Sequence, residues 1–159
     1  VLKNDSIHCI NLIPTNLYGP NDNFNPISSH VVPGLICKIH DAMLEKKNEY
    51  TVWGSGSPLR ELLFVDDLIN AVEIVIESPK SYEILNIGSN VEISIKDLAL
   101  KIKDLTGFKG EIVFDNSKPD GVERKTLDSS LINSLGWTPK VSLNQGLSKT
   151  YNWFLKNST

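Results

Sequence analysis

The segment Val52–Leu68, VWGSGSPLRELLFVDDL, contains in short form the pattern that runs through the whole chain. Its beginning continues an apolar run, Tyr50–Trp53, that predicts a strand, and Gly54–Pro58 predicts a turn. Arg60–Val65 is predicted to be extended again. Asp66 and Asp67 then begin a helix, where acidic residues suit the positive end of the helix dipole. The apolar residues of that helix recur on one face: Leu68, Ala71, Val72, Val75 and Ile76.

Upstream of this segment the same alternation is expected. Ile7–Ile13 is rich in β-branched residues and ends at Pro14, which favours an interior strand of a parallel sheet. Pro14–Pro26 is predicted to be a polar loop. A helix follows, capped by Ser28 or Ser29. Its apolar residues repeat at three-to-four spacing: Val31, Leu35, Ile39 and Ala42.

Downstream, Glu83–Ile87 and Glu111–Phe114 are predicted strands. Between them a helix capped by Ser94 ends at Gly107. The remaining segments are a polar loop at Asp115–Arg124 and two helices, one from Asp128 to Gly136 and one at Leu143–Leu155. Strands that alternate with amphipathic helices indicate an α/β fold. The strands are too few and too unevenly spaced for a complete doubly wound sheet.

Composition excludes several classes of function. The chain has 159 residues, 40% of them hydrophobic, and a net charge of -3, which argues against nucleic-acid binding. Cys9 and Cys37 are far apart, so we expect reduced thiols rather than a zinc or redox site. The sequence shows no membrane-spanning run and no signal-peptide pattern, so a cytoplasmic location is the default expectation. The chain does not begin with Met, and we expect it to be a piece of a longer polypeptide.

Four segments, taken in order, carry a resemblance to a known family. They are PTNLYGPNDNF at Pro14–Phe24, SHVVPGLICKIHDA at Ser29–Ala42, the Val52–Leu68 segment, and KPDGVERK at Lys118–Lys125. Together they resemble the GDP-L-fucose synthases, a group within the extended short-chain dehydrogenase/reductases. The similarity extends from Ile10 to Phe154. The YGP and Gly-x-Gly…Arg…Val-Asp-Asp patterns are widespread among sugar-nucleotide enzymes, whereas DNF…SHVVP joined to KPDG is much narrower.

The resemblance implies the C-terminal part of an NAD(P)-binding, Rossmann-type enzyme, mostly its substrate-binding lobe. Residues 1–159 would form two interleaved lobes, without the N-terminal Rossmann half. The implied activity is NADPH-dependent 3,5-epimerisation and 4-reduction of GDP-4-keto-6-deoxy-D-mannose to GDP-L-fucose, by an enzyme that is a homodimer when intact.

Three of the family's motifs have no counterpart in the chain. It lacks a GxGxxG phosphate loop and a Tyr-x-x-x-Lys pair, and the family's epimerisation cysteine falls outside the matching part, so neither Cys9 nor Cys37 is assigned that role. The chain on its own is therefore expected to be inactive.

The resemblance places Pro14, Thr15, Asn16 and Leu17 near the nicotinamide end of NADPH. The loop would follow a parallel strand, which is where α/β sheets bind ligands. The alternative is a plain turn that leaves the strand. His30 is implied to contact the cofactor and to act as the general acid in epimerisation, since an imidazole can titrate near neutral pH. The alternative for His30 is a surface or capping residue.

Lys38, Trp53 and Arg60 match the family's substrate contacts. An arginine can bind pyrophosphate oxygens through two N–H groups, and an aromatic ring can cover a sugar or a base. The alternatives are a solvated lysine, a core tryptophan and a surface arginine. Asp120, in KPDG, matches a carboxylate that binds the substrate nucleotide, although Pro-Asp-Gly is also a common turn. Trp137 and Trp153 are expected to pack in the core.

Two other functions remain open on the sequence. A related nucleotide-sugar 4-reductase or 4-epimerase would share the fold and the cofactor, but such enzymes generally lack the segment that contains His30. A non-catalytic protein that binds sugar nucleotides is the second alternative. The presence or absence of the phosphate loop and the Tyr-x-x-x-Lys pair upstream would distinguish it from an enzyme.

Overall fold

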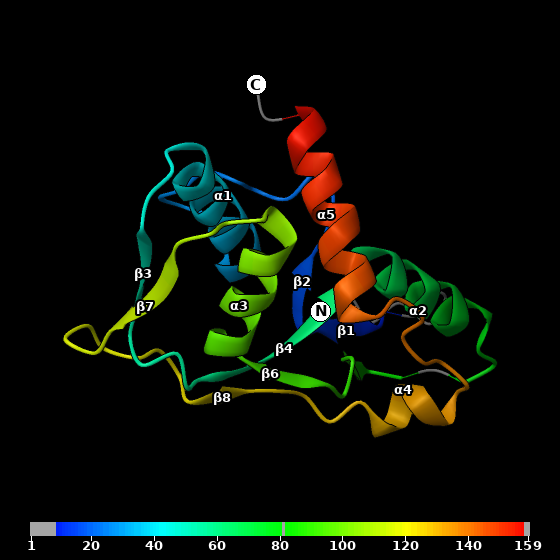
Figure 1. Cartoon of the computed structure of the whole chain (residues 1–159). Coiled ribbons are helices and arrows are strands. Elements are labelled where there is room, and N and C mark those ends of the chain that lie inside the picture. Colours follow the sequence, from blue (N-terminus) through cyan, green and yellow to red (C-terminus); the bar gives the residue numbers. More distant parts are fainter. Residues whose placement is uncertain (1–8, 81, 158–159) are drawn as a thin grey trace.

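The computed structural model describes residues 9–80 and 82–157, in which strands alternate with helices (Figure 1). The strands are β1 Asn11–Pro14, β2 Asn16–Tyr18, β3 Glu49–Trp53, β4 Leu59–Phe64, β5 Ile84–Ile87, β6 Glu92–Ser94, β7 Glu111–Asp115 and β8 Arg124–Lys125. The helices are α1 Val31–Leu44, α2 Val65–Glu77, α3 Ile95–Thr106, α4 Ser130–Ser134 and α5 Leu143–Asn157. The predicted α/β class is confirmed. No helix in the described ranges is long and apolar enough to cross a membrane.

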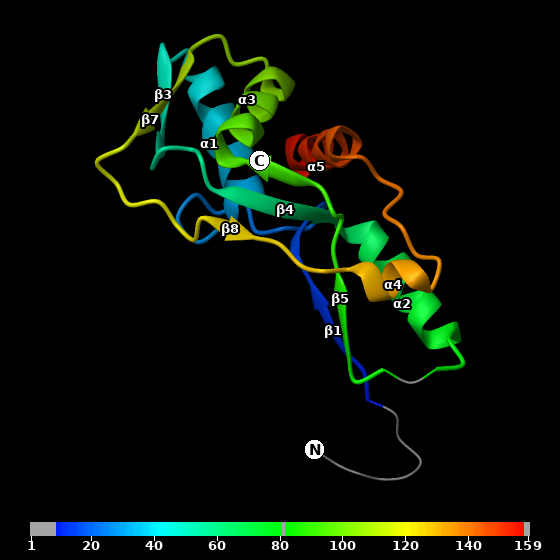
Figure 2. The ribbon, with the colours of Figure 1, turned by 90° about the horizontal axis from the view of Figure 1, so that it is seen from below.

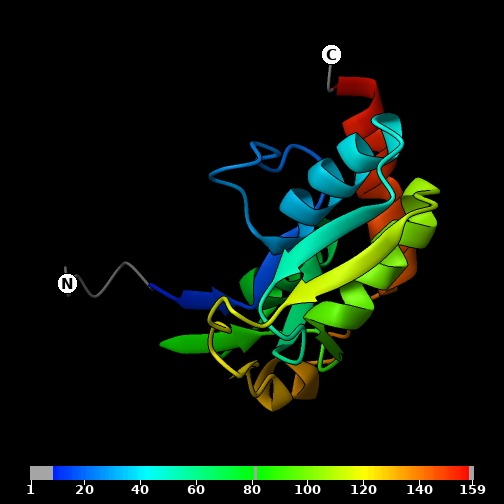
Figure 3. The same ribbon diagram turned by 60° about the vertical axis from the view of Figure 1, so that its left-hand side comes forward.

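The strands form three groups. β1 pairs in parallel with β5, and β3 pairs in parallel with β7. In the third group, β4 pairs in parallel with β2 and β8 and antiparallel with β6. Figure 2 shows β1 and β5 side by side near α2 and α4, at a distance from β3 and β7. Figure 3 shows the β3–β7 pair lying over α1 and α3.

Strand β4 contributes to two separate hydrophobic cores. Leu62 and Phe64 belong to a larger core with α1, α3 and α5, whereas Leu63 belongs to a smaller core with α2, β5 and Trp137. Successive side chains of a strand point to opposite faces, which explains how one strand serves both cores. β4 is therefore the element through which the two cores are joined.

The first predicted strand and the loop after it differ from the structure. Ile7 and His8 lie outside the described residues, and β1 begins at Asn11 and includes Pro14. Asn16–Tyr18, within the predicted loop, forms strand β2. Its three residues become a strand because β4 provides a parallel partner, with Asn16 opposite Leu62. Such short strands depend on pairing rather than on a local pattern.

The predicted cap of α1 is wrong. His30 is the N-cap residue, with an extended backbone and no side-chain cap hydrogen bond. Ser28 instead accepts hydrogen bonds from Asn23 through its carbonyl and its hydroxyl. The backbone N–H of Ser29 donates to the carbonyl of Asn25 at 3.0 Å. Both serines thus belong to the turn before the helix, and His30 occupies the junction itself.

Other predicted boundaries are confirmed or moved by a few residues. Ser94 caps α3 by accepting from the N–H of Asp97 at 2.9 Å, and Gly107 ends the helix in the left-handed conformation. α2 begins at Val65 rather than at Asp66. α4 is shorter than predicted, because Ser129 is its N-cap and Asp128 precedes it. Trp137 is buried as expected, whereas Trp153 is half-buried.

Candidate functional site

Two cavities meet at the start of α1. The first, which we call the α1–β3 cavity, has a volume of about 330 Å³ and lies between α1 and β3. The second, the β2–β4 cavity, has a volume of about 550 Å³ and lies over β2 and β4. His30 and Val31 line both of them. Predicted cofactor and substrate residues therefore come together around one histidine.

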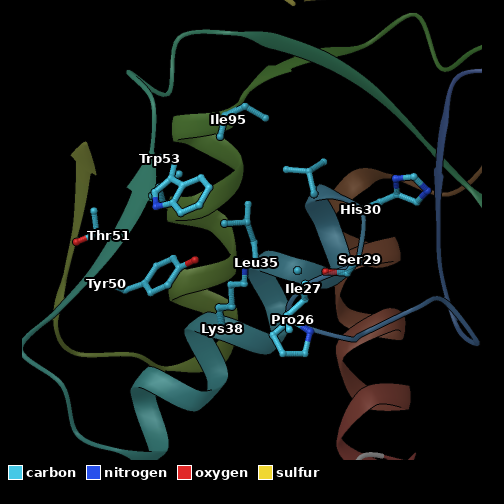
Figure 4. A pocket seen from close by; sticks show the side chains of 13 residues that line it. Pro26, Ile27, Ser29, His30, Leu35, Lys38, Tyr50, Thr51, Trp53 and Ile95 are labelled. Atoms are coloured by element: carbon cyan, nitrogen blue, oxygen red, sulfur yellow. The ribbon is translucent and has the colours of Figure 1, made fainter. Parts of the chain in front are cut away.

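His30 is exposed at this junction, and its main chain begins α1. Its carbonyl accepts the hydrogen bond of the Gly34 N–H at 2.9 Å, which is the first turn of the helix. Figure 4 shows the imidazole turned away from Trp53, toward the other side of α1. An exposed imidazole between two cavities can contact a molecule bound in either of them.

The loop that leads to His30 is anchored by aromatic stacking. The ring of Phe24 lies 5.7 Å from that of Trp153 and 5.0 Å from that of Phe154, both in α5. Within the loop, the side chain of Asn25 accepts hydrogen bonds from the backbone N–H groups of Ile27 and Ser28. These contacts fix the wall of the α1–β3 cavity before the helix begins.

The β2–β4 cavity contains most of the predicted cofactor residues. Thr15, Asn16 and Leu17 line it. The Thr15 hydroxyl and the Asn16 amide both donate to the carbonyl of Glu61, each at 3.0 Å. Pro14 is not among the lining residues; it ends β1 opposite Ile87.

Two cations face the same cavity. Arg60 and Lys125 both line it, and they are register partners in the β4–β8 pair. Nη1 of Arg60 donates to the carbonyls of Leu59 and Val122, each at 2.7 Å. Arg60 makes no ion pair with a carboxylate of the described residues. Its orientation is thus fixed by carbonyl groups while its charge remains available to an anion.

The α1–β3 cavity contains the other two predicted substrate contacts. Lys38 lies on its α1 side and Trp53 on its β3 side (Figure 4). Trp53 is 75% exposed, which excludes the alternative that it is a core tryptophan. The Lys118 ammonium lies 5.8 Å from its ring centroid. Part of the indole is therefore accessible to a molecule bound in the cavity.

Asp120 lies outside both cavities and closes a loop. Its Oδ1 accepts from the backbone N–H of Ser55 at 2.8 Å, and its Oδ2 accepts from the Ser55 hydroxyl at 2.7 Å. These hydrogen bonds hold the pKa of Asp120 below its usual range. Ser55 follows Gly54 in the turn after Trp53, so Asp120 ties the KPDG loop to that turn. Its role toward a nucleotide remains a prediction.

Comparison with known proteins identifies the family. The model of the NAD dependent epimerase/dehydratase family matches residues 2–88. The chain belongs to this family. Curated relatives within it include GDP-L-fucose synthase 1 from Arabidopsis thaliana, 53% identical over 145 residues, covering 91% of this chain and 45% of the relative. GDP-L-fucose synthase from Escherichia coli K12 is 44% identical over 155 residues, covering 92% of this chain and 48% of the relative.

A solved structure shows the same fold. The GDP-L-fucose synthetase from Naegleria fowleri, solved bound to NADP, has a TM-score of 0.86 and 35% identity, covering 94% of this chain and 47% of that chain. The chain thus spans about half the length of the epimerase/dehydratase relatives it matches. The fold is the C-terminal part of a Rossmann-type extended short-chain dehydrogenase/reductase, as the sequence predicted.

The structure adds residues to this family site that sequence reasoning missed. In the sequence, Lys125 is only the last residue of the KPDGVERK motif, and it reaches the β2–β4 cavity because β8 pairs with β4. Tyr50 was predicted only as part of a strand, yet its ring lines the α1–β3 cavity. Glu61 was overlooked although it is almost fully buried beside two predicted cofactor residues. Only the pairing of distant segments reveals all three.

Proposed function

We propose that this chain supplies the GDP-sugar site and the epimerisation histidine of a GDP-L-fucose synthase. That enzyme would convert GDP-4-keto-6-deoxy-D-mannose to GDP-L-fucose by 3,5-epimerisation and NADPH-dependent 4-reduction. The observation that carries the proposal is the meeting of the two cavities at His30, with cations in each. We further propose that the intact enzyme is a cytoplasmic homodimer.

The charges and the aromatic ring suit a nucleoside diphosphate sugar. Arg60 offers a guanidinium that is already oriented, and Lys125 adds a second positive charge in the same cavity. Both could bind diphosphate oxygens through charge-assisted hydrogen bonds. Trp53 and Lys38 line the adjoining α1–β3 cavity. There an aromatic ring and a cation can hold the nucleoside end of the GDP-sugar.

The segment Thr15–Leu17 fits the nicotinamide end of NADPH. It follows the carboxyl end of parallel strand β1, and its side chains border the β2–β4 cavity. NADPH, when bound, would supply the hydride for C4. Thr15 and Asn16 hold the cavity wall in place through their bonds to Glu61, and Leu17 provides an apolar surface for a ring.

His30 would carry a proton during epimerisation. Inversion at C3 or C5 removes a proton from one face of the sugar and delivers one to the other face. The imidazole lies at the border of both cavities. It can donate a proton to a sugar carbon that lies between the two cations, Arg60 and Lys125, and the Thr15–Leu17 segment.

Tryptophan fluorescence tests the nucleotide site directly. Among the tryptophans of the described residues, Trp53 is 75% exposed and Trp137 is 1% exposed. We expect GDP to quench the emission of the chain and Trp53→Phe to remove the quenching. Trp53→Ala, titrated with GDP by calorimetry because it has lost the fluorescent reporter, should weaken GDP binding by roughly two- to tenfold, since stacking contributes about 0.5–1.5 kcal/mol.

Trp153→Phe is the matched control, since Trp153 stacks on Phe24 away from β3. That variant should retain the GDP-dependent quenching. If GDP leaves the emission of the wild-type chain unchanged at millimolar concentration, the proposed nucleotide site is refuted.

The chain alone should not consume NADPH. It contains neither a GxGxxG loop nor a Tyr-x-x-x-Lys pair, the groups expected to bind phosphate and to polarise the ketone. Absorbance at the NADPH band should stay constant when the purified chain is mixed with the keto-sugar and NADPH. Steady oxidation above that of a sample without protein would contradict this expectation.

A further inference from the structure

Glu61 is a buried carboxylate that lies directly behind the β2–β4 cavity. It is 1% exposed. Its neighbours in β4, Arg60 and Leu62, line the cavity, so the alternation of the strand directs Glu61 to the opposite face. This is the face on which Leu63 enters the smaller core. Glu61 therefore does not touch a molecule bound in the cavity, and its contacts belong to the second core.

Those contacts connect three separate segments. Oε1 of Glu61 accepts from the backbone N–H of Asn90 at 2.7 Å, and Oε2 accepts from that of Leu127 at 2.9 Å. The Glu61 carbonyl accepts from Thr15 and Asn16. Leu127 follows two residues after Lys125, which faces the cavity. The carboxylate thus holds the Asn90 backbone and the segment that presents Lys125. The bonds from Thr15 and Asn16 go to a main-chain carbonyl that any residue at this position would supply.

The carboxylate has little freedom to move. A Cβ added to Gly88 would collide with Oε1 of Glu61 and with the hydroxyl of Ser129. Ser129 is itself buried, and its Oγ has no hydrogen-bond partner among the described residues. A side chain confined in this way transmits its position to the groups bonded to it rather than adjusting to them.

We propose that the carboxylate of Glu61 is a positioning group that fixes the Lys125 segment beside β4, and with it the Lys125 side of the β2–β4 cavity. The proposal rests on the proposed function, because it concerns the cavity that would hold the GDP-sugar and the cofactor. Glu61 acts only through other groups, because its carboxylate holds the backbone N–H groups of Asn90 and Leu127.

A second buried carboxylate provides a matched control. Asp67 is also 1% exposed, and it also accepts from two backbone N–H groups, those of Lys140 and Val141, at 2.9 and 3.0 Å. Asp67 and the residues it bonds line neither of the two cavities at His30. Glu61→Gln and Asp67→Asn each replace one acceptor oxygen by an amide that cannot accept, at nearly constant volume. Both should lower the thermal midpoint, because each leaves one buried N–H group unsatisfied.

The two variants should differ in GDP binding. At a temperature where both are folded, we expect Glu61→Gln to weaken GDP binding by roughly tenfold, as for one misplaced charged contact, and Asp67→Asn to leave it unchanged. Amide NMR shifts should change at Lys125 in Glu61→Gln, as well as at the directly bonded Asn90 and Leu127. In Asp67→Asn they should change near Lys140 and Val141 instead.

The outcomes separate the alternatives. If Glu61→Gln loses stability but retains both GDP affinity and the amide shift of Lys125, then Glu61 has only a structural role. If the wild-type chain does not bind GDP, the proposed function fails at this cavity, and the amide shifts alone still test whether Glu61 sets its walls. Should Glu61→Gln not fold, Glu61→Asp is measured in the same way, since it keeps the carboxylate and shortens the side chain by one methylene.

Discussion

His30→Asn should lose most epimerase activity and still reduce the C4 ketone. The assay requires an enzyme of full family length that carries this sequence. Asparagine is close in size and keeps a hydrogen-bonding group at the junction of the two cavities, but it cannot titrate near neutral pH. Loss of one general acid costs about two to four orders of magnitude in rate. Hydride transfer to C4 does not need this acid, so reduction should continue and trap sugars that are incompletely epimerised.

Two signals separate the epimerase and reductase activities. NMR in deuterated water reports exchange at C3 and C5, and absorbance at the NADPH band reports reduction. His40→Asn is a suitable control, because His40 is also on α1 but bonds the Tyr151 hydroxyl through Nδ1 at 2.9 Å, inside the helix packing. It should affect stability and leave exchange intact.

Other results would change the assignment. Normal exchange at both carbons in His30→Asn would remove His30 from the mechanism. Loss of reduction together with exchange, in a folded variant, would make His30 a group that positions substrate or cofactor. If the unmodified enzyme reduced the ketone without exchange at either carbon, the 4-reductase alternative would be correct.

Arg60→Ala should weaken GDP binding by about ten- to a hundredfold. A charge-assisted hydrogen bond to a diphosphate contributes on the order of 1.5–3 kcal/mol, and the Arg60 guanidinium is already held by the carbonyls of Leu59 and Val122. Calorimetric titration with GDP measures the effect. NADPH affinity, measured in the full-length enzyme, should change much less. Lys38→Ala should act in the same direction but more weakly, because it is a single mobile charge.

Arg124→Ala is the matched control for Arg60→Ala. Arg124 precedes Lys125 in β8, and it forms an ion pair with Glu92 at 2.6 Å instead of lining the cavity. It removes the same charge from a nearby strand, so a general electrostatic effect would appear equally in both variants. Unchanged GDP affinity in Arg60→Ala would show that the guanidinium does not bind the diphosphate.

Much of the fold follows from local patterns in the sequence. α3 is predicted at both ends, because Ser94 and Gly107 act through their own backbone neighbourhood. β2, β6 and β8 were missed, because strands of two or three residues exist only where a distant segment provides hydrogen-bond partners. The cap at His30 was missed because the turn before α1 places Ser28 against the side chain of Asn23 and bonds the Ser29 N–H to the carbonyl of Asn25.

The candidate site could likewise be predicted only in part. Family motifs placed His30, Lys38, Trp53 and Arg60, and the structure brings all four to two adjoining cavities. The motifs could not show that Asp120 is bonded to Ser55 or that Glu61, rather than Arg60, is buried. Arg60 and Glu61 are adjacent charged residues in a predicted extended segment, and nothing in the local sequence indicates which of the two is buried. Their opposite directions depend on which face of β4 meets the second core.

The stacking of Phe24 on Trp153 also has a consequence for biosynthesis. A ribosome makes Phe24 well before Trp153, whatever sequence precedes or follows them. At about 5–20 residues per second, the two rings are separated by roughly 6 to 26 seconds of translation. Throughout that interval the loop before His30 lacks the surface of α5 against which it packs. The wall of the α1–β3 cavity that this loop forms can therefore gain its stacking contact only once α5 has been synthesised.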